Sequence, residues 1–183
     1  MKRDKNILEE LCLQFCQIIE KFTEYVIISG FLVISSGRSR GTEDIDVIIK
    51  RLDLEQFKKM HNELKRNNFE CLQSSKPEKI FNLYLTENLP VRYCMEDRFI
   101  PNIEMKFAKD KLDEYQLENR KKIDFTDIDV FFSSVEATIA FKEEFLKSKK
   151  DLEDAKHLRI VYKDSINKNE IQKIKYMINK YKL

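Results

Sequence analysis

One stretch of the chain decides the fold, and it reads Ser29-Gly30-Phe31-Leu32-Val33-Ile34-Ser35-Ser36-Gly37-Arg38-Ser39-Arg40-Gly41-Thr42-Glu43-Asp44-Ile45-Asp46-Val47-Ile48-Ile49. Its apolar end predicts a buried β-strand that carries Asp44 and Asp46. Residues two apart leave the same face of a strand with their Cα atoms about 7 Å apart, so the two carboxylates repel each other. A divalent cation such as Mg²⁺ takes carboxylate oxygens as ligands, which gives this spacing a chemical purpose. The alternative is a strand edge with two solvated aspartates.

The residues before this strand predict a strand, a turn and a short helix. Residues 25–28 are mostly β-branched and run into Ser29 and Gly30, and residues 31–34 suffice for about one helical turn. Backbone N–H groups at the start of such a helix suit phosphate oxygens. Gly37 and Gly41 are expected to take the positive φ angles that turn the chain back.

This pattern resembles the active-site signature of the polymerase β-type nucleotidyltransferase superfamily, a glycine-containing turn followed by Asp-x-Asp. The wording Arg-Ser-Arg-Gly-Thr-Glu-Asp-Ile-Asp is most similar to the AbiEii-like and related small nucleotidyltransferases. The resemblance implies that Asp44 and Asp46 are catalytic and bind Mg²⁺ or Mn²⁺. It also implies that Gly30 contacts a nucleoside triphosphate.

Other residues of the stretch are expected to contact the nucleotide. The guanidinium groups of Arg38 and Arg40 would bring positive charge to the phosphates, and Ser29 and Thr42 flank the two parts of the motif. The usual turn pair in the superfamily is Gly-Ser or Gly-Gly, whereas this chain has Gly30-Phe31 with Ser29 on the other side.

A third carboxylate is predicted on a later strand. Residues 102–107 alternate strictly between polar and apolar, which places Glu104 on the polar face. The superfamily commonly adds such a carboxylate, so Glu104 is the expected third metal ligand or base if this strand lies beside the Asp44 strand. A half-exposed strand is the alternative.

The last third of the chain predicts helices with a second polar group. Ser133 with Glu136, and Ser148 with Asp151, have capping-box spacing. These boxes predict two consecutive helices that begin near residues 134 and 149.

The order of a helical lysine followed by Lys-Asp-x-x-Asp resembles the downstream motifs of AbiEii-like enzymes. The resemblance implies a catalytic role for Lys142 and nucleotide contacts for Asp151 and Asp154, turned toward the Asp44 strand. Without the resemblance, these residues would be ordinary helix-terminal acids and a surface lysine.

The predicted fold class is α+β, with a nucleotidyltransferase core over residues 1–132 and a helical C-terminal half over residues 133–183 packed on it. The core is a mixed β-sheet flanked by helices. We expect helices near residues 8–22, 54–66 and 168–181, several short strands between residues 69 and 107, and one more strand at 128–132.

The composition indicates a compact enzyme in a reducing compartment. The 183 residues are 42% hydrophobic, and 36% charged residues leave a net charge of only +2, which excludes a global polyanion-binding signature. Four cysteines show neither a disulfide framework nor zinc spacing. We expect no secretory or membrane-spanning segment and a cytoplasmic location.

The sequence therefore predicts a metal-dependent nucleotidyltransferase that moves NMP from an NTP to an acceptor hydroxyl on a tRNA end, a protein or a small molecule such as an aminoglycoside. A catalytically degraded nucleotide-binding or regulatory module of the same fold is the alternative, motivated by the Gly30-Phe31 departure. A toxin role with a cognate antitoxin is a third interpretation.

Overall fold

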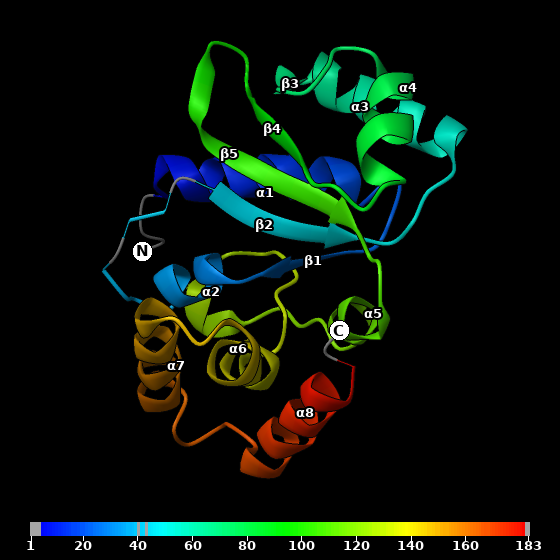
Figure 1. Cartoon of the computed structure of the whole chain (residues 1–183). Helices are drawn as coiled ribbons and strands as arrows, with labels where there is room; N and C mark the ends of the chain where they lie inside the picture. Colours follow the sequence, from blue (N-terminus) through cyan, green and yellow to red (C-terminus); the bar gives the residue numbers. More distant parts are fainter. Residues whose placement is uncertain (1–4, 40, 43, 182–183) are drawn as a thin grey trace.

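The computed structural model describes residues 5–39, 41–42 and 44–181. One five-stranded sheet lies in the order β1-β2-β5-β4-β3 (Figure 1). β2 and β5 pair in parallel, and the other three neighbouring pairs are antiparallel. The sheet is therefore mixed, as predicted. Its strands are β1 (Tyr25–Ile28), β2 (Asp44–Ile49), β3 (Phe69–Cys71), β4 (Val91–Met95) and β5 (Arg98–Phe107).

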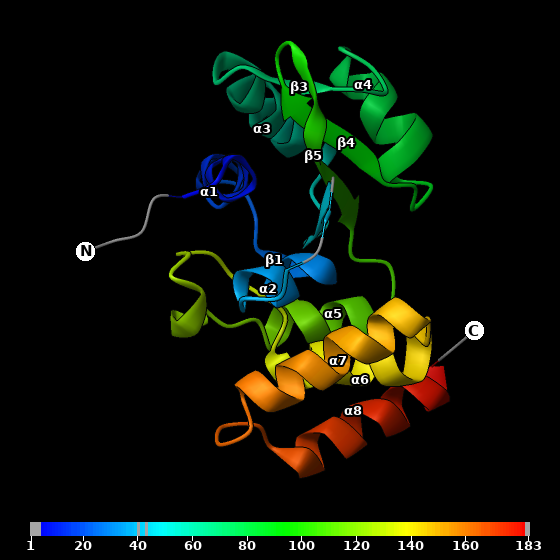
Figure 2. The same ribbon diagram turned by 90° about the vertical axis from the view of Figure 1, so that its left-hand side faces the viewer.

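Helices surround the sheet, and all the named elements after β5 are helical in the described part of the chain. Figure 2 shows α5, α6, α7 and α8 stacked below the strands. The α-helices are α1 (Ile7–Ile19), α2 (Gly30–Ser35), α3 (Leu54–Arg66), α4 (Pro77–Ile80), α5 (Lys111–Glu118), α6 (Val135–Phe141), α7 (Lys149–Val161) and α8 (Lys168–Tyr181). Three shorter helical segments are the π-helices η1 (Phe81–Leu85) and η3 (Lys142–Leu146) and the 3₁₀-helix η2 (Asp124–Thr126). None of the helices in the described ranges is both long and apolar enough to cross a membrane.

The alternation of β2 decides which face of the sheet carries charge. Ile45 and Val47 are fully buried in the main core. Asp46 leaves the opposite face together with Ile48, which packs with Leu117 of α5 in a small second cluster. Because α5 covers only the Ile48 end of this face, the Asp46 end is left open to a cleft.

The helix boundaries follow local capping signals. The Asp53 side chain accepts from the backbone N–H of Gln56, and the two residues form a reciprocal capping box at α3. The predicted box at Ser133 is displaced by one residue, because Ser134 is the N-cap of α6. Ser148 is the N-cap of α7, as predicted.

The strands β3, β4 and β5 confirm the predicted short strands between residues 69 and 107. Residues 77–85 between them form α4 and η1, because Pro77 suits the first position of a helix. Two local predictions were wrong. Residues 128–132 form no strand, and Phe132 makes only isolated bridges to Ile27 and Lys121. Gly37 has the expected positive φ of 90°, whereas Gly41 does not lie in the left-handed region.

Residues of both predicted halves contribute to one core. The main cluster joins α1 and the sheet to apolar side chains of α6, α7 and α8, including Ile139, Leu158 and Ile174. The boundary near residue 132 stays a prediction.

Candidate active site

Three carboxylates lie on one face of two neighbouring strands. Asp44 and Asp46 belong to β2, and Glu104 of β5 is the register partner of Asp46. The predicted adjacency of these strands is therefore confirmed. Burial raises the pKa of Asp46 to about 6, and repulsion from Asp44 and then Glu104 adds to the effect. The opposing contributions are smaller than these causes, so negative charge is concentrated here.

Neighbouring side chains hold two of the carboxylates in place. The Thr42 hydroxyl lies 3.3 Å from the Asp44 carboxylate and 3.1 Å from its backbone carbonyl. Arg92 of β4 stands opposite Glu104, and its Nε and Nη2 donate to Oε2 at 3.1 and 2.9 Å. The arginine fixes the Glu104 side chain and neutralises part of its charge.

The turn between β1 and α2 lies beside these carboxylates. Ser29 has a φ of 67° and a ψ of −128°, a conformation that glycine adopts far more readily. A hydrogen bond from the Ser29 side chain lowers the pKa of Asp46 against the effect of burial. Gly30 begins α2, while Phe31 is buried and stacks on Phe132 with 6.0 Å between ring centroids. The two residues of the turn are therefore Ser29 and Gly30. The sequence analysis compared Gly30 and Phe31 with the Gly-Ser or Gly-Gly pair of the superfamily, and this choice of residues was wrong.

Lys142 reaches the site from η3 and is almost completely buried. Its Nζ lies 2.9 Å from Asp151 Oδ1 and 2.8 Å from Asp154 Oδ2, both on α7. Asp154 is fully buried and also pairs with Arg38, which forms a second ion pair with Glu153 at 2.9 Å. This network connects the segment after α2 to the C-terminal helices.

Three residues of this network were expected from the sequence to contact the nucleotide, but the structure places them in ion pairs. Arg38, Asp151 and Asp154 are not among the described residues that line the cleft, and their charges are used in ion pairs. Asp151 and Asp154 hold the ammonium group of Lys142 in ion pairs, and Lys142 itself lines the cleft. The expected contact of Arg40 lies outside the described residues.

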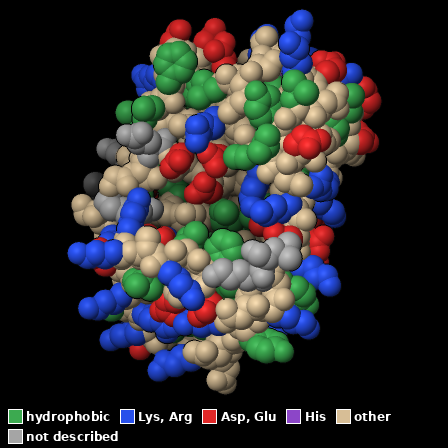
Figure 3. Space-filling view, viewed as in Figure 1, with side chains coloured by type: hydrophobic (Ala, Val, Ile, Leu, Met, Phe, Trp, Pro, Cys, Tyr) green, Lys and Arg blue, Asp and Glu red, His purple; other side chains and the backbone are tan. Residues whose placement is uncertain are grey.

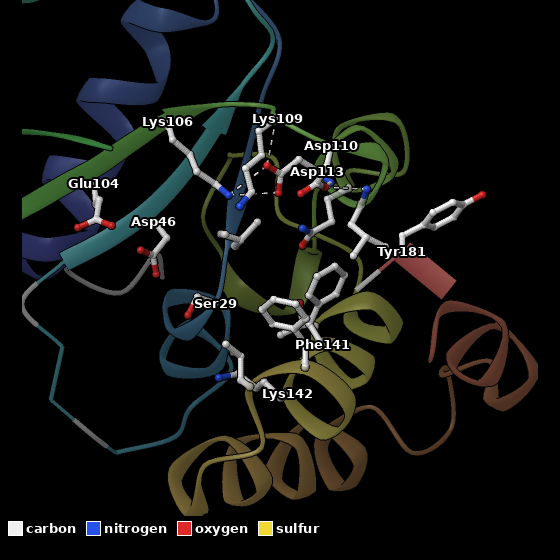
Figure 4. Close-up of a pocket in the computed structure, with 16 residues that line it drawn as sticks. Ser29, Asp46, Glu104, Lys106, Lys109, Asp110, Asp113, Phe141, Lys142 and Tyr181 are labelled. Carbon is white, nitrogen blue, oxygen red and sulfur yellow. Dashed lines mark hydrogen bonds and ion pairs between the residues drawn. The ribbon is translucent and has the colours of Figure 1, made fainter. Parts of the chain in front are cut away.

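A cleft of about 410 Å³ lies between the sheet and the helical half. Figure 3 shows acidic side chains beside a hollow in the middle of this face, with basic side chains across it. In Figure 4, Ser29 lies between Asp46 and Lys142. The lining residues are Ile28, Ser29, Asp46, Glu104, Lys106, Lys109, Asp110, Leu112, Asp113, Gln116, Thr138, Phe141, Lys142, Phe145, Leu146 and Tyr181.

The sequence analysis missed the basic side of the cleft. Lys106 Nζ lies 3.2 and 3.1 Å from the two carboxylate oxygens of Asp113, and its charge lowers the pKa of Asp46. Lys106 shares the polar face of β5 with Glu104, so strand alternation could have found it. No sequence signal indicated that α5 would bring Asp113 and Gln116 to the same place.

The carboxylates suit a hard cation that arrives with a phosphate ligand. In the described ranges, no three His, Cys, Asp or Glu side chains are grouped closely enough to hold a metal ion by themselves. Mg²⁺ is usually bound by one or two carboxylates plus substrate phosphates, for which Asp44 and Asp46 suffice. Asn102, the register partner of Asp44, adds a buried amide oxygen that has no hydrogen-bond partner in the described part of the chain. This set of oxygen donors fits Mg²⁺.

Two solved structures have a similar overall fold at low sequence identity. The antibiotic-resistance factor ANT(2'')-Ia matches with a TM-score of 0.57 and 12% identity, over 94% of this chain and 91% of that one. An antigenic nucleotidyltransferase-like protein from Paracoccidioides brasiliensis matches with a TM-score of 0.55 and 15% identity, over 96% of this chain and 88% of that one. The chain has a nucleotidyltransferase fold.

Asp44, Asp46 and Glu104 lie on the open face of this sheet. No protein-family model matches the chain, and no curated protein matches its sequence. The narrower resemblance to the AbiEii-like branch stays a prediction.

Proposed function

We propose that the protein is a metal-dependent nucleotidyltransferase that moves NMP from an NTP to an acceptor hydroxyl. The observation that carries the proposal is the cluster of Asp44, Asp46 and Glu104 beside the Ser29 turn, in which repulsion and burial raise the pKa of Asp46 to about 6. A cluster of like charges that destabilises itself is typical of a site built for a cation. The nucleotidyltransferase fold supports the same interpretation.

We assign a different chemical role to each group of residues in the cleft. Asp44 and Asp46 would hold Mg²⁺, which supplies charge neutralisation for the triphosphate when bound. The backbone N–H groups at Ser29 and Gly30 would bind the phosphates. Lys142 lines the same side of the cleft, and its ammonium group has a third N–H donor besides those used for Asp151 and Asp154. The acceptor oxygen attacks the α-phosphorus, the bond to the bridging oxygen of the β-phosphate breaks, and pyrophosphate leaves.

Glu104 is the group that we assign to accept the proton of the attacking hydroxyl. It lies beside Asp46 in the register and lines the cleft, and Arg92 fixes its carboxylate. A carboxylate held within reach of the acceptor removes the proton as the new bond forms.

The decisive experiment is incubation with each of the four α-labelled NTPs and Mg²⁺, separately with total RNA, cell protein and an aminoglycoside as acceptor. Transfer of label by the wild type, but not by Asp46→Asn or in EDTA, supports the proposal and identifies the acceptor class. NTP binding that is weak or independent of Mg²⁺, without label transfer or pyrophosphate release from any acceptor, would identify the degraded binding module instead.

The toxin interpretation needs a separate readout. If nucleotidyl transfer inactivates a cellular RNA or protein, expression of the wild type arrests growth and Asp46→Asn does not. Equal growth of both strains would reject a toxin role and leave nucleotidyl transfer in place.

A further inference from the structure

The cleft has a second chemical environment beyond the carboxylates. Thr138 and Phe141 of α6 and Lys142 and Phe145 of η3 follow one another along the chain and face the same cleft. All four line the cleft, and α5 adds Gln116. Figure 4 shows Phe141 pointing from α6 into the cleft, with Asp46 and Ser29 to its left. These four side chains lie next to the part of the cleft assigned to the phosphates. Together with Gln116 they line a mostly apolar part of the cleft, called the slot below.

The slot contains polar groups that lack a partner. Thr138 is only 3% exposed, and its hydroxyl has no hydrogen-bond partner among the residues that the structure describes. A threonine in a helix usually bonds to the carbonyl one turn earlier, but this one does not. Gln116 Oε1 accepts from Ser133 Oγ at 3.1 Å, which leaves its amide N–H groups as donors. Buried hydroxyls are nearly always paired, so the Thr138 hydroxyl is suited to a ligand.

We propose that this slot binds the base of the nucleoside triphosphate, a subsite that rests on the function proposed above. A nucleobase presents a flat face that stacks on aromatic rings and a polar edge that takes hydrogen bonds. Phe141 and Phe145, with ring centroids 6.1 Å apart, offer the aromatic surface. Thr138 and Gln116 offer the groups that read the edge.

The other contents of the cleft favour a base over a polyamine or aminosugar acceptor in this slot. Such acceptors need carboxylates whose charge is available. Asp113 at the slot is paired with Lys106 and also accepts from the backbone N–H of Lys109, while Asp110 is the N-cap of α5 and accepts from the backbone N–H groups of Leu112 and Asp113. The volume of about 410 Å³ suits one ligand of nucleotide size. The slot is therefore assigned to the donor nucleotide.

Calorimetric titration tests this assignment without turnover. The magnesium complexes of the four NTPs and of inorganic tripolyphosphate are titrated into the wild type, Thr138→Val and Phe145→Leu. We expect the best NTP to bind the wild type at least about 10-fold more tightly than tripolyphosphate does. Thr138→Val reduces the spread of affinities among the four NTPs by about 3- to 10-fold. Phe145→Leu weakens all NTPs, and neither variant changes tripolyphosphate binding.

Phe99→Leu is the matched control, because Phe99 is 72% exposed and is not among the described residues of the cleft. Phe145 is 43% exposed, so its variant still tests the slot if Thr138→Val does not fold. Equal binding of NTPs and tripolyphosphate to the wild type would overturn the base subsite alone. Unchanged NTP affinities in the folded cleft variants would do the same. If neither NTP nor tripolyphosphate binds the wild type, the proposed function fails as well.

Discussion

Replacing Asp46 by Asn is expected to stabilise the metal-free protein at neutral pH. Burial and the charges of Asp44 and Glu104 raise the pKa of Asp46 from its ordinary 3.8 to about 6. Below pH 3.8 Asp46 is protonated in both the folded and the unfolded state, so it does not change the free energy of unfolding. Above about 6 it is ionised in both, and its charge disfavours the folded state fully.

The size of the effect follows from the pKa difference. At about 1.36 kcal/mol per pKa unit, the ionised carboxylate lowers the free energy of unfolding by about 3 kcal/mol. Partial solvent access and the lost hydrogen bond from Ser29 reduce the expected gain in Asp46→Asn to about 1–2 kcal/mol.

Urea unfolding in EDTA, followed by circular dichroism between about pH 4 and pH 8, measures this gain. It should grow as the pH rises from about 4 to about 7 and then stay constant. Asp164→Asn is the control, because Asp164 is exposed and should change little. Addition of Mg²⁺ should stabilise the wild type more than Asp46→Asn. A less stable Asp46→Asn at pH 8, or a gain independent of pH, would refute the reasoning.

Three further perturbations test other parts of the site. Lys142→Met removes one of the cations that pair with the fully buried Asp154, and should lower the free energy of unfolding by about 3–5 kcal/mol in urea titrations; a change below about 1 kcal/mol would show that the network is not stabilising. Ser29→Gly should be about 1 kcal/mol more stable than Ser29→Ala in thermal unfolding, since both lose the hydroxyl and only glycine relieves the positive φ of 67°. Arg159 lowers the pKa of Glu143, so the stabilisation lost in Glu143→Gln should be present above about pH 5 and disappear as the pH falls below the folded-state pKa; an unchanged difference at about pH 3 would contradict it.

The sequence alone was sufficient for the strand-turn-helix-strand at residues 25–49 and for the place of Glu104 on the polar face of its strand, whereas the pairing that puts Glu104 beside Asp46 was decided by the sheet. The first two features depend on local alternation and spacing, which the chain displays directly. It was not sufficient for α4 and η1, because a short helix with little apolar periodicity resembles the irregular segments around it. The backbone conformation of Ser29 was also hidden, since a positive φ at a non-glycine residue is set by the packing on both sides of the turn.

What the sequence determined is the kind of chemistry: carboxylates two apart on a buried strand, beside a turn at the start of a helix. What only the tertiary structure decided is which other groups meet them. Lys106, Gln116 and Thr138 come from three separate elements and share one cleft because those elements pack on one face of the sheet. The partners of Lys142 were fixed in the same way, by burial that requires a charged ammonium to be paired. Contacts between distant segments depend on this packing, and no local pattern of residues records it.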